Sequence, residues 1–126
     1  MSAFSKIFEA KAIFEQLFDK EIKTITLNSD FRRLHIVLSD GIEIYVIYND
    51  HGEYGYNILF SKLDLDRCRF DNYDDQWDVD SRPHHFHPRK KTEVESSKMT
   101  GNPKDDIPYL YKMLKLGKLY KTEYFL

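Results

Sequence analysis

The spacing of hydrophobic residues changes once along this chain, from a helical period to a strand period, at about Lys23. Before that point, apolar residues recur at intervals of three and four positions, as on one face of an amphipathic helix. These residues are Phe4, Ile7, Ala10, Phe14, Leu17 and Phe18. After it, short runs alternate apolar and polar residues, which is typical of half-buried strands. The pattern predicts a helix over residues 3–19, capped by Ser2, followed by a sheet.

The dipeptide Asp40-Gly41 stands between two alternating runs, residues 34–38 and 42–48. Asp-Gly suits the positive φ angles of a tight hairpin turn, so we expect these runs to pair antiparallel. Two further runs, residues 56–61 and 67–72, follow turn-forming residues. With the earlier alternation at Ile25 and Leu27, the runs predict a meander of about five strands.

Helical spacing returns near the C-terminus, at Ile107, Leu110, Tyr111 and Leu114. We expect Asp106 to cap a short helix, Pro108 to lie in its first turn and Gly117 to end it. The sequence thus predicts a single α+β domain over residues 1–126, in which both helices pack on one antiparallel sheet.

Charge and cysteine content narrow the function classes. The chain carries 19 Lys and Arg against 21 Asp and Glu, so contact with nucleic acid requires a local basic patch. Cys68 is the one cysteine, which excludes an internal disulfide framework and a cysteine-rich zinc site. Apolar runs fall far below the roughly 20 residues of a membrane-spanning helix, and the N-terminus lacks a secretory-signal pattern. We therefore expect a cytoplasmic protein with no membrane partner.

The most unusual segment runs from Arg82 to Lys91, with the sequence RPHHFHPRKK, and holds three of the five histidines. Proline favours extended geometry in the residue before it. In an extended segment His85 and His87 project on one face, while Phe86 points to the core.

Three interpretations of this segment remain open from the residues alone. The histidine pair could hold a divalent metal ion, with a third ligand from Asp71, Asp74 or His51. The histidines could instead act as base and acid beside cations that stabilise a phosphate. The segment could also be a solvated edge strand without a chemical role.

A second feature, residues 67–72, ends one of the predicted strands. Alternation sends Cys68 and Phe70 to the core and leaves Arg69 and Asp71 available on the opposite face. Arg69 could clamp an anion, or it could form a plain ion pair with Asp71. For Cys68, an inert buried role is favoured over that of a nucleophile.

The succession of Arg69-Phe70-Asp71-Asn72 and Pro83-His84-His85-Phe86-His87 resembles the TumE-like family, the toxin component of prokaryotic toxin-antitoxin modules. The resemblance covers residues 22–116. The chain has Tyr73-Asp74-Asp75 where many members carry Ala-Pro-His, so one possible active-site histidine of the family is missing here.

The resemblance implies an RNA-directed endonuclease that a separate helix-turn-helix antitoxin neutralises. Its implied catalytic residues are His84, His85, His87, Arg69 and Asp71. His85 or His87 would act as base or acid, Arg69 would hold the scissile phosphate, and Asp71 would orient a histidine. No cofactor is expected unless Asp71, His85 and His87 hold a divalent metal. Substrate contacts are expected from Asn72, Arg82, Arg89, Lys90 and Lys91.

Two rival functions stay open. One is a noncatalytic module in which a sheet edge and the basic segment dock a protein or nucleic acid. The other is a metal-dependent hydrolase built on the histidine pair. Exposed strand edges also make a homodimer an expectation.

Overall fold

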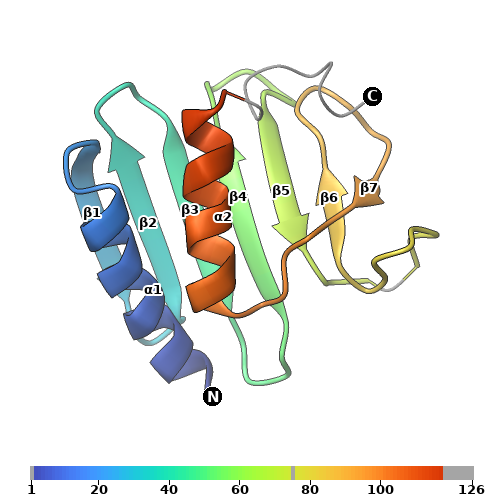
Figure 1. Ribbon diagram of the computed structural model, residues 1–126, viewed down its shortest axis with the longest axis horizontal. Coiled ribbons are helices and arrows are strands. Elements are labelled where there is room, and N and C mark those ends of the chain that lie inside the picture. The colour runs from blue at the N-terminus through green and yellow to red at the C-terminus, as the bar shows by residue number, and fades with distance from the viewer. Residues whose placement is uncertain (1, 75, 118–126) are drawn as a thin grey trace.

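Two layers form the structure, a computed structural model that describes residues 2–74 and 76–117. Within these residues a seven-stranded sheet forms one layer, and two helices lie together on one of its faces (Figure 1). In chain order the elements are α1 (Ala3–Leu17), β1 (Ile22–Asn28), β2 (Arg33–Leu38), β3 (Glu43–Tyr48), β4 (Tyr54–Leu59), β5 (Arg67–Asp71), β6 (His85–His87), β7 (Glu95–Ser96) and α2 (Pro103–Lys115). The α+β class and the packing of both helices on an antiparallel sheet are confirmed.

The sheet is a simple meander in which each strand pairs antiparallel with the next along the chain. The predicted antiparallel pairing across Asp40-Gly41 is confirmed, since β2 pairs with β3. Gly41 has a φ of 94° in this turn, but Asp40 does not have the positive φ that was also expected of it. The sheet has seven strands where about five were expected. The difference lies in β6 and β7, which are three and two residues long and therefore too short to show a period of two.

Helix α1 begins as its sequence predicts. The Ser2 hydroxyl accepts a hydrogen bond from the backbone amide of Ser5, which satisfies one of the amides left unpaired at a helix start. Ile7, Ala10 and Phe14 on its apolar face are buried. Neither helix within residues 2–74 and 76–117 has the length and apolar character that crossing a bilayer requires.

Helix α2 begins three residues before the predicted cap. Asn102 caps it by accepting a hydrogen bond from the Lys104 amide, and Pro103 occupies the first turn, where proline is well tolerated. The prediction for Pro108 is also wrong, because this residue lies inside the helix. Gly117 follows the helix with a φ of 70°, as expected of a residue that ends it.

Asp106 ties the loop before α2 to the sheet. Its buried carboxylate accepts hydrogen bonds from the Thr100 and Gly101 amides, at 2.8 and 2.7 Å, and from the Tyr56 hydroxyl, at 2.7 Å. Burial raises the pKa of Asp106, and these hydrogen bonds oppose the rise. Asp106 was predicted to cap the helix; its side chain instead links α2 to β4 and to the loop before α2.

The two faces of the sheet differ in chemistry. Toward the helices, alternation buries aliphatic and aromatic side chains such as Ile36, Val46 and Phe70. Cys68 belongs to this core as predicted, and burial raises the pKa of its thiol. The opposite face is not covered by any helix among the described residues (Figure 1), and it carries the polar side chains of the candidate site.

Candidate active site

Strands β5 and β6 bring the two sequence features side by side. In their register, Arg69 pairs with His87 and Asp71 with His85. Alternate residues of paired strands share a face, so these four side chains gather on the open face of the sheet. Phe86 lies between the two histidines in sequence and is buried in the core. The prediction that His85 and His87 project together, opposite Phe86, is confirmed.

Asp71 is the centre of this group. One carboxylate oxygen, Oδ2, accepts a hydrogen bond from Nε of Arg69 and lies 3.8 Å from Nε2 of His87. The other, Oδ1, lies 2.5 Å from Nε2 of His85. Asp71 is only 4% exposed, which corrects the expectation that its carboxylate is available on the surface, because the neighbouring side chains cover it.

His85 is almost fully enclosed, with 2% of its surface exposed. Its Nδ1 lies 2.9 Å from the carbonyl oxygen of Pro83. Because a carbonyl only accepts, Nδ1 carries a proton. A substrate on the surface of the protein therefore cannot touch this ring directly.

Arg69 and His87 are the solvent-facing members, with 38% and 33% of their side chains exposed. Burial lowers the pKa of His87 below its ordinary value; Asp71 opposes the shift, and His85 and the two nearby arginines reinforce it. The site therefore presents a permanent cation beside an imidazole biased toward its neutral form.

A depression of about 470 Å³ opens beside this group, and Arg67, Arg69, His87 and Lys91 contribute to its lining. A second hollow of about 560 Å³ shares Arg69 with it and continues across β4 to β2. The candidate site is thus one end of a longer concave surface on the open face of the sheet.

Two residues of the predicted site lie apart from this depression. His84 directly precedes β6, and its Nδ1 forms a hydrogen bond of 2.9 Å with the Tyr54 hydroxyl. Asn72 accepts a hydrogen bond from the Tyr54 amide and donates one to the Gly52 carbonyl. Both side chains hold the chain at the beginning of β4, and their roles in catalysis and substrate binding stay predictions.

The basic residues around β6 do not form one patch at the depression. Lys91 contributes to its lining, whereas Arg89 pairs with buried Asp66 at 2.5 Å and stacks over the Phe60 ring. Arg82 and Lys90 are exposed, and neither is among the residues that line this depression. Substrate contact by these four residues stays a prediction.

Of the three candidate third ligands, Asp71 meets the histidine pair. Asp71, His85 and His87 each offer a ligand atom, and these atoms lie within 4.8 Å of one another. Among the described residues no other group of histidine, cysteine and acidic side chains is this close. Asp74 and His51 are exposed and stand outside it.

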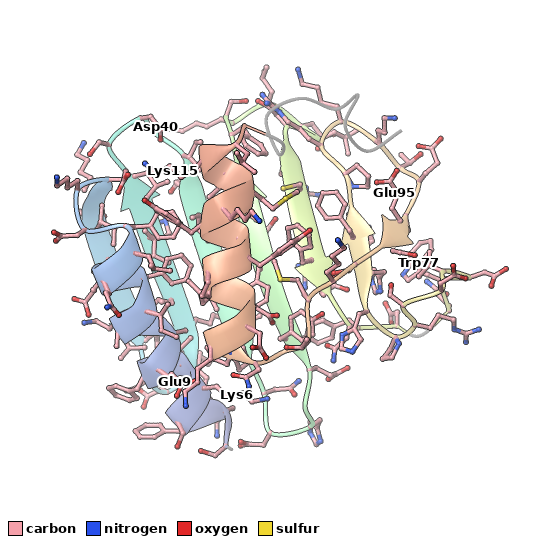
Figure 2. The ribbon with its side chains drawn as sticks, viewed as in Figure 1. Lys6, Glu9, Asp40, Trp77, Glu95 and Lys115 are labelled. Carbon is pink, nitrogen blue, oxygen red and sulfur yellow. The ribbon has the colours of Figure 1, made fainter. Side chains whose placement is uncertain are left out.

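Sequence reasoning missed Trp77. It lies in the stretch predicted as an irregular loop, yet its ring centroid is 5.9 Å from that of His85 and 5.8 Å from that of His87. Figure 2 places it at the edge of the molecule beside β6 and β7, far from α1. One feature of the sequence could have identified Trp77: it is the single tryptophan of the chain and lies in a polar stretch.

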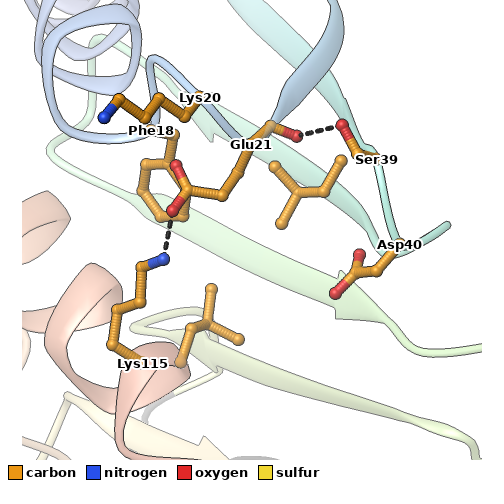
Figure 3. A pocket seen from close by; sticks show the side chains of 8 residues that line it. Phe18, Lys20, Glu21, Ser39, Asp40 and Lys115 are labelled. Atoms are coloured by element: carbon orange, nitrogen blue, oxygen red, sulfur yellow. Dashed lines mark hydrogen bonds and ion pairs between the residues drawn. The ribbon is translucent and has the colours of Figure 1, made fainter.

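A third hollow, of about 200 Å³, lies between the end of α1 and the end of α2 (Figure 3). Phe18, Leu38 and Leu114 give it apolar walls, and Glu21 and Lys115 form an ion pair across it. It contains no histidine or cysteine, so it offers none of the chemistry gathered at Asp71.

Comparisons of this chain with family models, with curated proteins and with solved structures found no significant match. The resemblance to the TumE-like family therefore stays a prediction that depends on the motif residues of β5 and β6.

Proposed function

We propose that this protein is an endoribonuclease toxin of the TumE-like type that cleaves RNA at the depression beside Arg69 and His87. The observation that supports the proposal most is the pairing of these two residues across β5 and β6 above the buried carboxylate of Asp71. Phosphodiester cleavage needs a cation that binds the phosphate and a group that activates the attacking oxygen. This pair supplies the cation and a group of the required type.

Arg69 is the phosphate-binding residue of the proposal. Its Nε donates to Asp71, which fixes the guanidinium plane and leaves the terminal NH₂ groups for a phosphate. Its NH₂ group also lies over Gly55, where an added Cβ would be 3.0 Å away. The absence of a side chain at Gly55 thus lets the guanidinium approach the backbone of β4.

The reaction proposed is attack of the ribose 2′-oxygen on the adjacent phosphorus. The new O–P bond forms as the bond from phosphorus to the 5′-oxygen breaks, and the products carry a 2′,3′-cyclic phosphate and a 5′-hydroxyl. The 2′-oxygen loses a proton, and the leaving 5′-oxygen takes one from water. Two routes to this activation fit the geometry: His87 accepts the proton itself, or a metal ion held at Asp71 activates the oxygen.

The longer concave surface suits a single RNA strand. Arg33 and Tyr45 line the second hollow together with Arg69 and Tyr73. Tyr45 is 40% exposed and stacks on His35 with 4.3 Å between ring centroids. Guanidinium groups and exposed aromatic rings on a sheet are the features with which proteins bind unpaired bases and their phosphates.

The test is cleavage of end-labelled single-stranded RNA by the purified protein. We expect products with cyclic phosphate ends and a loss of about 10²- to 10⁴-fold in rate for His87→Ala and a comparable loss for Arg69→Ala. His51→Ala is the matched control, because His51 lies in an exposed turn outside the depression. Equal rates for wild type and His87→Ala would refute the proposal.

The cellular form of the proposal has its own test. Expression should stop growth, and a helix-turn-helix protein encoded beside the toxin should relieve the arrest. RNA that binds in an Arg69-dependent manner without being cleaved would instead identify the noncatalytic binding module.

A further inference from the structure

We propose that Asp71, His85 and His87 form a binding site for one divalent transition-metal ion, with Zn²⁺ as the reference ion. The catalytic role of the ion rests on the proposed function, whereas the existence of the binding site rests on geometry. Two imidazoles and one carboxylate are a ligand set that zinc and neighbouring divalent metals use. Their ligand atoms lie within 4.8 Å of one another.

The first argument is the orientation of His85. Nδ1 faces the Pro83 carbonyl at 2.9 Å and so carries the ring proton. Nε2, the other ring nitrogen, lies 2.5 Å from a carboxylate oxygen of Asp71. Two bare acceptors at this distance repel each other, so either a proton or a metal ion lies with them, and the proposal assigns a metal ion. A carbonyl that accepts from the remote ring nitrogen is also the usual support of a metal-bound histidine.

The second argument is the carboxylate itself. Oδ1 of Asp71 is buried and has no hydrogen-bond partner, although Oδ2 accepts from Arg69. A buried carboxylate oxygen without a donor costs free energy. Arg69 holds the carboxylate through Oδ2, while Oδ1 faces Nε2 of His85, and a metal ion there supplies the missing partner.

The third argument is accessibility. Asp71 and His85 are buried, whereas His87 is one-third exposed and borders the depression. Trp77 packs against both histidine rings and covers the site from the loop. Three protein ligands with one open side are the arrangement of catalytic rather than structural zinc sites. When bound, such an ion activates an attacking oxygen and stabilises negative charge on a phosphate.

The ion also settles the role of His87. A ring nitrogen of His87 that bound the ion would be unable to accept a proton, and the ion would then supply the activation of the attacking oxygen. Arg69 keeps its place beside the phosphate in either route. The two routes of the proposed function are therefore distinguished by metal dependence.

The test is zinc titration of the full chain after treatment with EDTA and removal of the chelator, read by calorimetry. We expect one ion per chain and an increase in the unfolding temperature on binding. His87→Ala should weaken affinity by at least about 100-fold, since changes to mere supporting residues already cost 10- to 100-fold. His85→Ala and Asp71→Asn should do the same, and circular dichroism without metal shows whether each variant folds.

His87→Ala keeps the test decisive, because its side chain is partly exposed and its loss leaves the core intact. His51→Ala is the control for binding by surface histidines and should bind zinc as wild type does. Failure to bind zinc, or binding unchanged in His87→Ala, would overturn the site.

Cleavage is measured separately on the same preparations. RNA cleavage that persists unchanged in EDTA would overturn the metal site and leave the ribonuclease standing. Zinc binding that depends on the three residues, in a protein that cleaves no RNA, would support the site and refute the ribonuclease.

Discussion

Replacing Gly55 by alanine should impair the site without altering any residue that bears its chemistry. The added Cβ would stand 3.0 Å from an NH₂ nitrogen of Arg69 and 3.3 Å from Cγ2 of Ile47. The guanidinium is the end of a flexible side chain, so it should move rather than the strand. We expect Gly55→Ala to displace Arg69 from its position above β4.

The size of the effect follows from the hydrogen bonds at stake. A hydrogen bond to a charged group contributes about 1.5–3 kcal/mol, and each 1.36 kcal/mol is tenfold in rate. Misplacing one Arg69 contact to the phosphate should therefore lower kcat/KM by about 10- to 150-fold. Stability should stay within about 1 kcal/mol of wild type, because alanine restricts the unfolded chain and offsets part of the crowding.

The assay is a double-mutant cycle on RNA cleavage, with urea unfolding of each variant. If Gly55→Ala acts through Arg69, it should have almost no further effect in an Arg69→Ala background. A full and additive loss in both backgrounds would refute the reasoning, as would unchanged activity in Gly55→Ala.

Three further changes test the packing around the site. Asp106→Asn should lower the free energy of unfolding by about 2 kcal/mol, because buried donors lose an acceptor. The folded-state pKa of Asp106 is raised above 3.8. The wild type should therefore lose stability relative to this variant as pH rises through that pKa. Tyr54→Phe removes the bond to His84 and should cost about 1 kcal/mol while leaving cleavage intact. Arg89→Ala should cost about 2 kcal/mol at pH 7, because Arg89 lowers the pKa of Asp66; this difference should shrink as pH falls through the lowered pKa of Asp66.

For each of these three variants, one result would contradict the prediction. A pH-independent difference between wild type and Asp106→Asn would contradict the burial argument for its pKa. Slower cleavage by Tyr54→Phe at unchanged stability would support the predicted catalytic role of His84. Weaker RNA binding by Arg89→Ala at unchanged stability would support its predicted substrate contact.

Local pattern was sufficient to predict most of the fold. The change of hydrophobic period predicted the order of helix and sheet, and the Asp40-Gly41 pair predicted the hairpin of β2 and β3. Alternation also placed His85 and His87 on one face with Phe86 opposite. Each of these features depends on residues near one another in sequence.

The rest depends on contacts between distant segments. Asp71 is buried because β6 returns beside β5 and the loop between them brings Trp77 against the histidines. The choice of Asp71 over Asp74 as the third member of the group follows from that register. The pairing of Arg89, just after β6, with Asp66, just before β5, likewise cannot be predicted from spacing, since a partner 23 residues away leaves no local pattern.

The start of α2 was wrong for a different reason. Prediction relied on the first apolar residue of the helical run, whereas the helix begins at a proline with an asparagine cap. Asp106 is placed one turn later, where its carboxylate is used by the loop amides and Tyr56.

The measurement that tests the central claim most directly is single-turnover cleavage of labelled single-stranded RNA by wild type and His87→Ala, each with Zn²⁺ and with EDTA. The account predicts cleavage by the zinc-loaded wild type to cyclic-phosphate ends, loss of that cleavage in EDTA, and a rate at least about 100-fold lower for His87→Ala. Cleavage by His87→Ala at the wild-type rate would contradict the assignment of catalysis to this site.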